Sequence, residues 1–379
     1  MLRQVLKSQY RRFVIFKNKE LKQLQKSDII VHVSEMDSYL NDAEKVFIKS
    51  FPKEKRVGLV RDLDYIDSKD FIPKRADWPK FERFLKNSNI CYTFFDIRSS
   101  IWLSAAENFD IIIWHPFSSP ASREEAETKI YFLEKYLKKI CFPSFDEIWG
   151  YEHKVRTSYL STFFSLPLVP TFTTNNKTDA LDFINHTTFP ILSKITTGSS
   201  SNDVTKIDNK KEAIKYANSC FSDIGRKTYW PYIRQKNYVY FQKFISDAKY
   251  DLRIITVGNK VFGYYRYAKE GDFRASGAGI REKKALPEEA MRIALDTRSK
   301  LRATSLAVDM LYSENEKKYY IIETSIFFGI ESPAQLAVNG LPGYYEYIND
   351  TFFFKEGRFW IQELALQYFF NSLLKSITV

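Results

Sequence analysis

Two carboxylates stand inside short apolar runs in the second half of the chain, Asp309 in LAVDMLY and Glu323 in YYIIETS. Burying a carboxylate in an apolar strand is costly unless a cation meets it, and Mg²⁺ bridging phosphate oxygens is such a cation. Three arginines precede them, on or just after two strand-like runs: Arg253, Arg266 and Arg274. Acids and arginines in this order predict a clamp for phosphate and metal. The alternative is that ordinary salt bridges join these groups to each other or to acids in the adjoining loop.

A lysine before a loop of small residues adds to this clamp. Lys194 lies in the short apolar run of FPILSKITTGSSSNDVTKI, which continues into small residues from Gly198 to Asn202. Small residues let backbone N–H groups approach an anion closely, and the lysine supplies a point charge. The GxxxxGK[ST] spacing of a Walker A motif is absent, so an exposed hairpin turn is the alternative.

The surrounding patterns predict the elements that position these residues. Residues 251–267 alternate as a strand, a turn at Gly258 and Asn259, and a second strand, which predicts a β-hairpin. Residues 56–145 alternate strands and a helix, so we expect a parallel sheet with crossover helices. Ligands usually bind beyond the carboxyl ends of such strands. The polar residues there are Arg61, Asp62, Asp96 and His115, and a capping or surface role is the expectation for each taken alone.

Composition bounds the class of protein. At 379 residues, of which 44% are hydrophobic, the chain can bury a large core in two or three domains. Its longest apolar runs are strand-sized, so no membrane span is expected. Three scattered cysteines without CxxC spacing fit a reducing compartment and exclude a cysteine zinc site. Because no secretory signal is visible at the N-terminus, we interpret the protein as cytoplasmic.

The formal net charge of +11 favours phosphate-bearing partners in general. No recognition helix, zinc finger or RNP-like motif stands out, so no specific nucleic acid is expected. Residues 1–25 carry seven Lys or Arg and one Glu, with apolar residues at helical spacing. They predict a basic helix that either packs on the domain behind it or docks on a membrane surface or an acidic partner. Residues 352–374 are aromatic and amphipathic, and we expect a helix that covers the core.

The order of these pieces resembles the ATP-grasp superfamily, and most closely its RimK-like branch of carboxylate-amine ligases. The resemblance covers residues 145–335, and its strongest match is KEGDFRASG with the preceding DLR and the following VD and ET. It implies a mixed α/β fold, in which a parallel α/β domain precedes a two-lobed ATP-grasp domain. The expected bounds are 1–50 for the basic extension, 51–145 for the first domain, 146–245 for the central lobe, and 246–379 for the C-terminal lobe with an aromatic C-terminal helix.

The same resemblance implies an ATP site. Lys154 and Lys194 match the pair of lysines that holds the ATP phosphates, and Asp251 belongs to the matching D-x-R. The mobile loop that closes over the phosphates matches Gly198, Ser199, Ser200 and the two residues after them. The hinge whose backbone meets adenine matches Gln242, Lys243, Phe244 and Ile245, where an acidic residue commonly stands in place of the lysine.

Roles in catalysis and metal binding also follow from the resemblance. Arg266 and Arg274 match the arginines that face the γ-phosphate and the acyl phosphate. Arg253 is the arginine of the D-x-R, and the resemblance implies a catalytic role for it as well. Asp309 and Glu323 match the magnesium ligands. An asparagine commonly follows two residues after that glutamate, and Ser325 stands here instead. A serine hydroxyl is a less secure ligand, so the second metal site depends on it.

The implied enzyme is an ADP-forming ligase that uses ATP and Mg²⁺. A substrate carboxylate becomes an acyl phosphate, an amine attacks it, and Arg274 stabilises the oxyanion. Peptide modification and decoration of cell-surface polysaccharide are both compatible with this chemistry, and the partners are then a carboxylate and an amine on a small molecule, a peptide or a saccharide. We expect a homo-oligomer. The alternative function is a catalytically silent ATP-grasp relative that binds a nucleotide or a partner.

Overall fold

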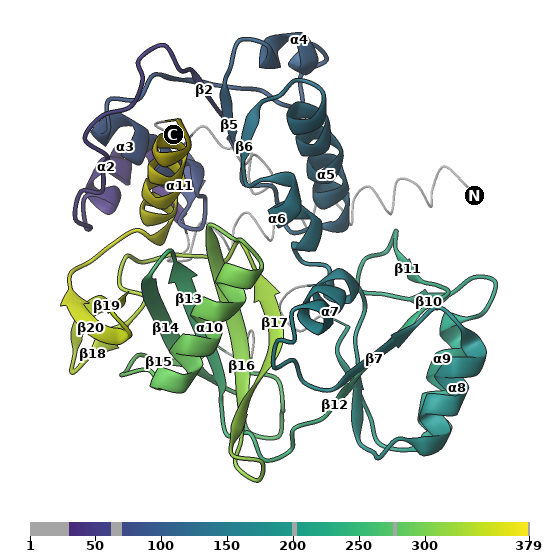
Figure 1. The fold of residues 1–379 in the computed structure, drawn as a ribbon. Coiled ribbons are helices and arrows are strands. Elements are labelled where there is room, and N and C mark those ends of the chain that lie inside the picture. The colour runs from purple at the N-terminus through teal and green to yellow at the C-terminus, as the bar shows by residue number, and fades with distance from the viewer. Residues whose placement is uncertain (1–29, 62–69, 199–202, 276–278, 378–379) are drawn as a thin grey trace.

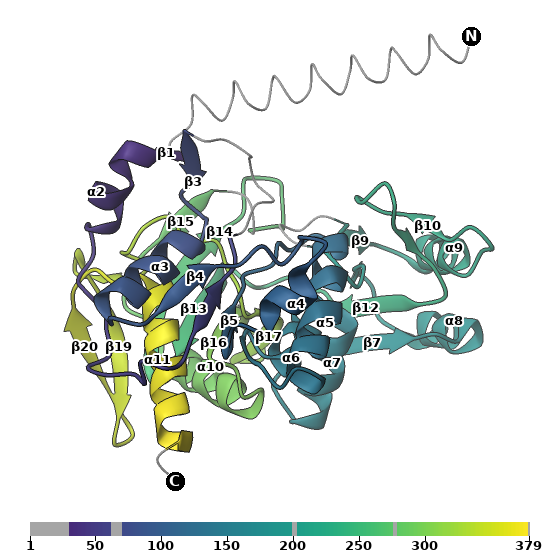
Figure 2. The same ribbon diagram turned by 90° about the horizontal axis from the view of Figure 1, so that it is seen from above.

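The computed structural model describes residues 30–61, 70–198, 203–275 and 279–377. The chain forms three units: an N-terminal unit, a central lobe and a C-terminal lobe, with the central lobe standing to one side (Figures 1 and 2). The predicted basic helix in residues 1–25 lies outside the described residues, as do Asp62, Ser199 and Ser200. No helix in the described ranges is long and apolar enough to span a membrane.

The N-terminal unit is built on a parallel sheet, as predicted. Its four strands lie in the order β4-β2-β5-β6, all parallel. The strand β5, Ile111–Ile113, is buried along its whole length, since helices cover both faces of the sheet (Figure 1). The unit contains β1 (Ile30–His32), η1 (Val33–Glu35), α2 (Met36–Leu40), β2 (Val57–Leu59), β3 (Phe71–Pro73), α3 (Trp78–Asn87), β4 (Tyr92–Phe94), α4 (Trp102–Ala106), β5, α5 (Pro120–Lys135), β6 (Ile140–Phe142) and α6 (Phe145–Gly150).

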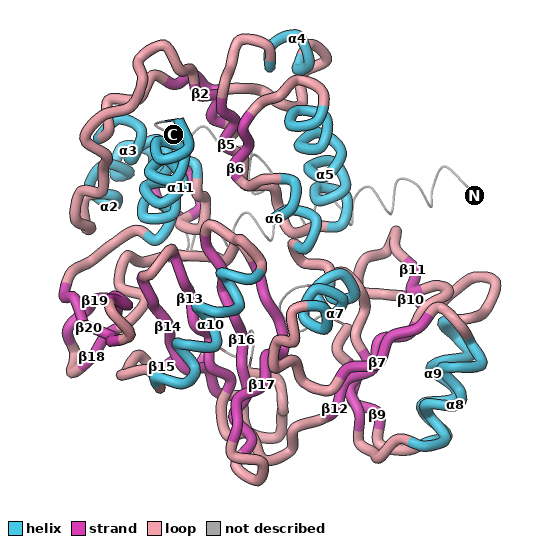
Figure 3. The backbone as a smooth tube through the Cα atoms, in the orientation of Figure 1, coloured by secondary structure: helices cyan, strands magenta, loops and turns pink. Residues whose placement is uncertain are grey.

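The central lobe follows helix α7, Lys154–Phe163. It has an antiparallel sheet in the order β7-β12-β8-β9 and a separate small core, in which Phe183 stacks between Phe172 and Phe241. Figure 3 shows α8 and α9 side by side on one face of this sheet. The elements are β7 (Thr171–Thr174), α8 (Lys177–His186), β8 (Ile191–Ser193), β9 (Thr205–Ile207), α9 (Lys210–Cys220), β10 (Arg226–Lys227), β11 (Arg234–Gln235) and β12 (Val239–Lys243).

The C-terminal lobe is an eight-stranded sheet that contains the predicted hairpin. β13 and β14 are joined by a turn at Gly258, whose φ of +55° suits glycine. Antiparallel pairing sets Arg253 opposite Asp309, and Asp309 opposite Glu323, so groups distant in sequence meet on one sheet. The elements are β13 (Asp251–Val257), β14 (Lys260–Tyr267), β15 (Ile280–Glu282), α10 (Glu288–Lys300), β16 (Ser305–Ser313), β17 (Lys318–Ser325), β18 (Ala337–Val338), β19 (Leu341–Ile348) and β20 (Thr351–Glu356).

The C-terminal helix, α11, spans Ile361–Ile377 and covers the core of the N-terminal unit. It packs on α3, where the guanidinium of Arg83 lies 2.6 Å from the Glu363 carboxylate in a buried ion pair. The expectation of a helix from residue 352 was wrong at its start. Phe352 and Phe354 are half-buried while Phe353 is exposed, which is the period of a strand, and these residues form β20.

Candidate active site

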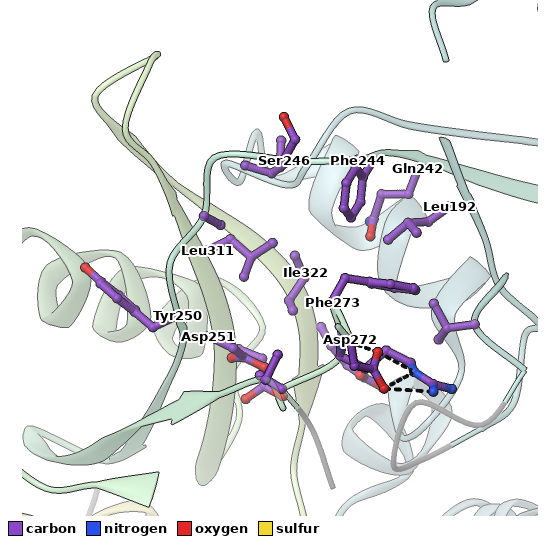
Figure 4. Close-up of a pocket in the computed structure, with 18 of the residues that line it drawn as sticks. Leu192, Gln242, Phe244, Ser246, Tyr250, Asp251, Asp272, Phe273, Leu311 and Ile322 are labelled. Atoms are coloured by element: carbon purple, nitrogen blue, oxygen red, sulfur yellow. Dashed lines mark hydrogen bonds and ion pairs between the residues drawn. The ribbon is translucent and has the colours of Figure 1, made fainter. Parts of the chain in front are cut away.

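A cleft of about 490 Å³ lies between the central lobe and the C-terminal lobe (Figure 4). Most of the residues singled out in the sequence line it. They are Lys154, Lys194, Gly198, Gln242, Lys243, Phe244, Ile245, Asp251, Arg274, Asp309 and Glu323. Strands from both lobes thus bring basic and acidic groups, expected from separate stretches of sequence, into one cavity.

The two lysines enter the cleft from different elements, and both are buried. Lys154 begins α7, and its Nζ lies 2.8 Å from Oε1 of Glu323 and donates to the carbonyl of Gly198 at 2.7 Å. Lys194 follows β8 directly, and its Nζ donates to Oε1 of Gln242 at 2.7 Å. The ammonium of Lys154 therefore has a carboxylate partner, whereas that of Lys194 has a neutral amide.

The different partners of Lys154 and Lys194 shift their pKa values in opposite directions. Burial disfavours the charged form of Lys194 and, despite the charge of Glu323, lowers its pKa to about 8, with the charge of Lys154 acting in the same direction. Burial also disfavours charge on Lys154, but the carboxylates of Glu323 and Glu152 outweigh it and raise the pKa. The buried ammonium of Lys194 therefore lies near another cation and has no carboxylate partner in direct contact. A bound polyanion would remove this electrostatic cost.

Arginines and aspartates on the C-terminal sheet form a buried network at the edge of the cleft. Arg253 binds Asp309 with two hydrogen bonds of 2.7 Å, from Nε to Oδ1 and from Nη2 to Oδ2. The Nη2 of Arg266 lies 2.5 Å from Oδ2 of Asp251 and 2.8 Å from Oδ2 of Asp309. The pairing of Arg253 is bidentate, whereas Arg266 bridges two carboxylates through one nitrogen, and both guanidinium groups are held in place.

The same network sets the charge of its acids. Burial alone would raise the pKa of Asp309, but the charges of Arg253 and Arg266 outweigh it and hold the pKa well below its usual range. Burial raises the pKa of Asp251 to about 6, with the charge of Asp309 acting in the same direction and the charge of Arg266 against it. Asp309 is therefore the carboxylate that stays ionised. It forms salt bridges with arginines, which was the alternative interpretation of the acids and arginines in the sequence.

The opposite end of the cleft is apolar. Leu192 from the central lobe and Leu311 and Ile322 from the C-terminal lobe line it, next to the hinge residues 242–245 (Figure 4). The ring of Phe244 meets the ring of Phe273 edge-on at 5.6 Å, so the loop after β14 reaches the hinge. In contrast, the side chain of Lys243 points outward to Glu316 at 2.5 Å. A flat apolar slot beside a polar, cationic end suits a nucleotide base and its phosphates.

Arg274 stands apart from the other two arginines. Its side chain is 47% exposed and pairs with Asp272 at 2.9 Å, in the loop after β14. It lines the cleft without contacting the buried network formed by Arg253 and Arg266. The structure thus brings two of the three predicted catalytic arginines together, and the role of Arg274 stays a prediction.

A second cavity, of about 230 Å³, lies between the N-terminal unit and the C-terminal lobe. Asp309 and Glu323 line both cavities, and Arg253, Arg266 and Ser325 line only the second. The hydroxyl of Ser325 donates to the carbonyl of Phe327 at 2.6 Å. The two predicted metal-binding carboxylates therefore stand where the two cavities meet.

Two residues of this second cavity were given no role in the site from the sequence. His115 was noted for its place after a strand of the parallel sheet, with a capping or surface role as the expectation. In the structure it follows β5, stacks on Phe327 at 3.9 Å, and has Nδ1 at 2.5 Å from Asp77. Glu152 precedes α7 by two residues, and burial together with the charge of Glu323 raises its pKa to about 7. No sequence signal pointed to Glu152.

The donor chemistry at Asp309 and Glu323 suits Mg²⁺. Among the described residues, no three His, Cys, Asp or Glu side chains gather into a complete metal site. Mg²⁺ in phosphate-binding sites commonly takes one or two carboxylates and completes its shell with phosphate oxygens and water. Two neighbouring carboxylates beside a cationic cleft fit that requirement. The metal-binding roles of Asp309, Glu323 and Ser325 stay predictions.

Two lobes that close on a cationic cleft, with paired carboxylates on a C-terminal antiparallel sheet, define the ATP-grasp class of nucleotide-binding proteins. Residues 164–336 match the model of the RimK-like ATP-grasp domain. The chain therefore contains a RimK-like ATP-grasp domain, and the resemblance inferred from its sequence is confirmed.

Individual relatives agree with this assignment. The chain is 25% identical over 198 residues to the alpha-aminoadipate–LysW ligase LysX of Saccharolobus solfataricus. That match covers 51% of this chain and 62% of the relative. The D-cycloserine synthetase DcsG has a similar fold, with a TM-score of 0.54 and 13% identity over 84% of this chain and 99% of that structure. The biotin carboxylase domain of 2-oxoglutarate carboxylase from Hydrogenobacter thermophilus has a TM-score of 0.50 at 13% identity, covering 74% of this chain and 66% of that structure.

Proposed function

We propose that the protein is an ATP- and Mg²⁺-dependent ligase that activates a carboxylate as an acyl phosphate and joins it to an amine. The observation that carries this proposal is the meeting of two cavities at Asp309 and Glu323. The first cavity suits a nucleotide, and the second opens toward the N-terminal unit. A phosphoryl group transferred beside Asp309 and Glu323 would pass from a nucleotide in the first cavity to a substrate in the second, which is the first step that such a ligase requires.

The first cavity is assigned to ATP. Leu192 and Ile322, beside the hinge, would hold the base, and Lys154 and Lys194 would hold the phosphates. Lys194 gains most from this arrangement, because the phosphates supply the anionic partner that its amide contact lacks. Lys243 contributes its backbone rather than its side chain, since the latter is paired outward with Glu316.

Catalysis then consists of positioning and charge neutralisation. Mg²⁺ bound at Asp309 and Glu323 would neutralise the triphosphate and orient it for in-line transfer. The substrate carboxylate attacks the γ-phosphate from the second cavity, where Arg253 and Arg266 hold fixed positive charge against it. An amine then attacks the acyl carbon and phosphate leaves, with Arg274 drawn in to stabilise the oxyanion.

The loop after β14 has a second task. Phe273 already contacts Phe244 across the cleft, so closing this loop excludes water from the mixed anhydride. Closure also requires Arg274 to leave its exposed pairing with Asp272, which is a weak contact in water.

The substrate proposal is restricted to a chemical class. The LysX relative is named as a ligase of α-aminoadipate and LysW, and DcsG as a synthetase of D-cycloserine. We extend to this chain only the ligation of a carboxylate to an amine, on a small molecule, peptide or saccharide. Cytoplasmic location, a homo-oligomeric state and docking of the basic N-terminal segment on a membrane or an acidic partner remain predictions.

One observation favours a second candidate, the silent nucleotide-binding relative. Asp309 is already neutralised by two arginines, and Arg274 is turned to an exposed aspartate. A silent module would bind nucleotide in this state and release no ADP. Measuring ADP release with a panel of carboxylates and amines separates the two candidates.

Calorimetric titration with Mg²⁺ and a non-hydrolysable ATP analogue tests the proposed function first. Wild-type protein should bind in a metal-dependent manner, and Glu323→Gln should weaken binding because it removes a negative charge facing both metal and Lys154. Glu356→Gln, on the exposed edge of β20, is the matched control and should bind as the wild type does. Absence of metal-dependent binding by the wild type would refute both candidate functions.

A further inference from the structure

Helix α5 has one narrow face that the rest of the chain does not cover. The helix lies on the side of the N-terminal unit opposite α3 and α11 (Figures 1 and 2). On one flank the ring of Trp102 in α4 lies 6.4 Å from that of Phe132, and on the other flank α5 packs against α6. Between these flanks the exposed positions are three or four residues apart, and we call them the α5 stripe: Ala121, Glu124, Thr128, Tyr131 and Lys135. Such spacing is typical of a helix face that meets another helix.

The charges on the flanks of α5 have partners within the chain, whereas those on the α5 stripe do not. On the flanks, Glu125 pairs with Lys129 at 2.7 Å, and Glu127 pairs at 2.7 Å with an arginine of α7. On the stripe, Glu124 and Lys135 form no ion pair with any described residue. They stand about three helical turns apart. The stripe is therefore negative towards the start of the helix and positive at its end.

Exposed apolar side chains adjoin the α5 stripe. Tyr131 is 42% exposed, and Tyr136, just beyond the helix, is 61% exposed, with the two rings 6.1 Å apart. Ile140 at the start of β6 and Leu103 of α4 are also exposed. Apolar side chains that gather on a surface with a polar rim commonly mark a contact site. The face thus combines apolar surface with two charges that await partners.

We propose that this face binds a second copy of the chain, with the two α5 helices antiparallel about a two-fold axis. A stripe that is negative at one end and positive at the other is complementary to itself when one copy is turned end to end. An axis that passes between Thr128 and Tyr131 sets Glu124 of each copy opposite Lys135 of the other. It also sets Thr128 of each copy opposite Tyr131 of the other, so a small side chain meets a large one.

The charge pattern selects this occupant over other partners. A membrane surface or a nucleic acid presents one sign of charge, whereas the α5 stripe carries both signs at separate ends. A second copy supplies the reversed pattern by symmetry. A stable interface buries about 800 Å² on each partner. The 16 residues of α5 form a rod only roughly 24 Å long, so Tyr136, Ile140 and Leu103 belong to the margins of the interface.

The proposed interface is separate from the candidate active site. No residue of the α5 stripe lines either cavity. Association of two copies and binding of nucleotide can therefore be measured independently, and the proposal stands whether or not the protein is a ligase. Metal-dependent binding of the ATP analogue then serves as a check that each variant described below has folded.

Sedimentation equilibrium of the full chain tests the proposal. The wild type at micromolar concentration should have the mass of two chains, and its dissociation constant should rise with NaCl because salt screens exposed ion pairs. Glu124→Lys and Lys135→Glu each turn two attractive pairs of the dimer into two repulsive pairs. Each should raise the dissociation constant about tenfold or more, and the double variant should return it to near the wild-type value.

Mixing the two single variants is the most specific measurement. In a dimer of one Glu124→Lys chain and one Lys135→Glu chain, the two substituted side chains face each other, as do the two unchanged ones. Both pairs are then of opposite charge, so the mixture should associate more tightly than either variant alone. Lys215→Glu, at an exposed position of α9 in the central lobe, is the matched control and should associate as the wild type does.

Three outcomes would overturn the proposal. A wild type that stays monomeric at tens of micromolar would do so without any variant. A dimer that neither charge reversal weakens would place the interface on another face. Single variants that associate weakly and do not recover when mixed would refute the antiparallel arrangement, provided that both retain the melting temperature of the wild type and bind the ATP analogue.

Discussion

Replacing Lys194 with methionine should make the nucleotide-free protein more stable while abolishing its affinity for ATP. Methionine is close to lysine in length and carries no charge. In the folded chain the ammonium of Lys194 is buried, and its contact in the cleft is with the neutral amide of Gln242. Removing the charge therefore removes an electrostatic cost that the nucleotide would otherwise offset.

The size of the effect follows from the pKa of Lys194. Its fall from 10.5 to about 8 corresponds to roughly 3 kcal/mol, since each pKa unit is worth about 1.4 kcal/mol. Losing the hydrogen bond to Gln242 costs about 1–2 kcal/mol, because the amide oxygen then lacks a donor. A net stabilisation of about 1–2 kcal/mol remains.

The pH dependence gives the sign an independent check. Below about pH 8 the lysine is protonated in both the folded and the unfolded chain, so the cost is fully present. As the pH rises from about 8 to 10.5, the folded protein loses this proton before the unfolded chain does, and the cost disappears. The advantage of Lys194→Met over the wild type should therefore shrink across this range.

Urea unfolding of both proteins without nucleotide, at neutral pH and around pH 10, measures this difference. A second series with Mg²⁺ and the ATP analogue should stabilise the wild type and leave Lys194→Met unchanged. A less stable variant at neutral pH, or an advantage that does not change with pH, would refute the view that Lys194 is an electrostatically uncompensated cation.

Three further predictions concern the rest of the cleft. Asp309→Asn should lose metal-dependent nucleotide binding and about 3 kcal/mol of stability, measured by urea unfolding, because Arg253 loses its carboxylate partner and Arg266 keeps only Asp251. Asp272→Ala should leave the melting temperature unchanged. Arg274→Ala should keep the nucleotide affinity of the wild type and lower the rate of ADP release. Equal rates of ADP release for the wild type and Arg274→Ala would show that this arginine has no role in catalysis. Lys243→Ala should bind the ATP analogue as the wild type does, because its side chain points away from the cleft; a large loss in calorimetry would contradict that assignment.

Periodicity and turn residues were sufficient to predict several elements. The alternation of residues 251–267 around Gly258 corresponds to β13 and β14, and the order of runs in residues 56–145 corresponds to the parallel sheet. Carboxylates inside apolar runs identified Asp309 and Glu323 as residues of the cleft, because a buried charge needs a partner wherever the strand lies.

Other features depend on long-range placement that no local pattern encodes. The pairing of Arg253 with Asp309 needs the register of two strands far apart in sequence. The backbone of Glu152 is left-handed, with a φ of +50°, and its carbonyl accepts from the guanidinium of Arg123, a residue of α5. The C-terminal helix was expected with the C-terminal lobe, and it contacts β13 there as well as α3 of the N-terminal unit. Its ion pair from Glu363 to Arg83 depends on segments about 280 residues apart meeting in space.

Helix α11 contacts both α3 of the N-terminal unit and β13 of the C-terminal lobe, and so helps to join these two units. One continuous core joins the N-terminal unit to the C-terminal lobe, while the central lobe has a separate small core. The lining residues of the second cavity all come from the N-terminal unit and the C-terminal lobe, so a rotation of the central lobe would leave its walls in place. The first cavity has one wall on the central lobe, so the same rotation would change its width. In this architecture we expect the cleft proposed for ATP to open and close while the second cavity keeps its shape.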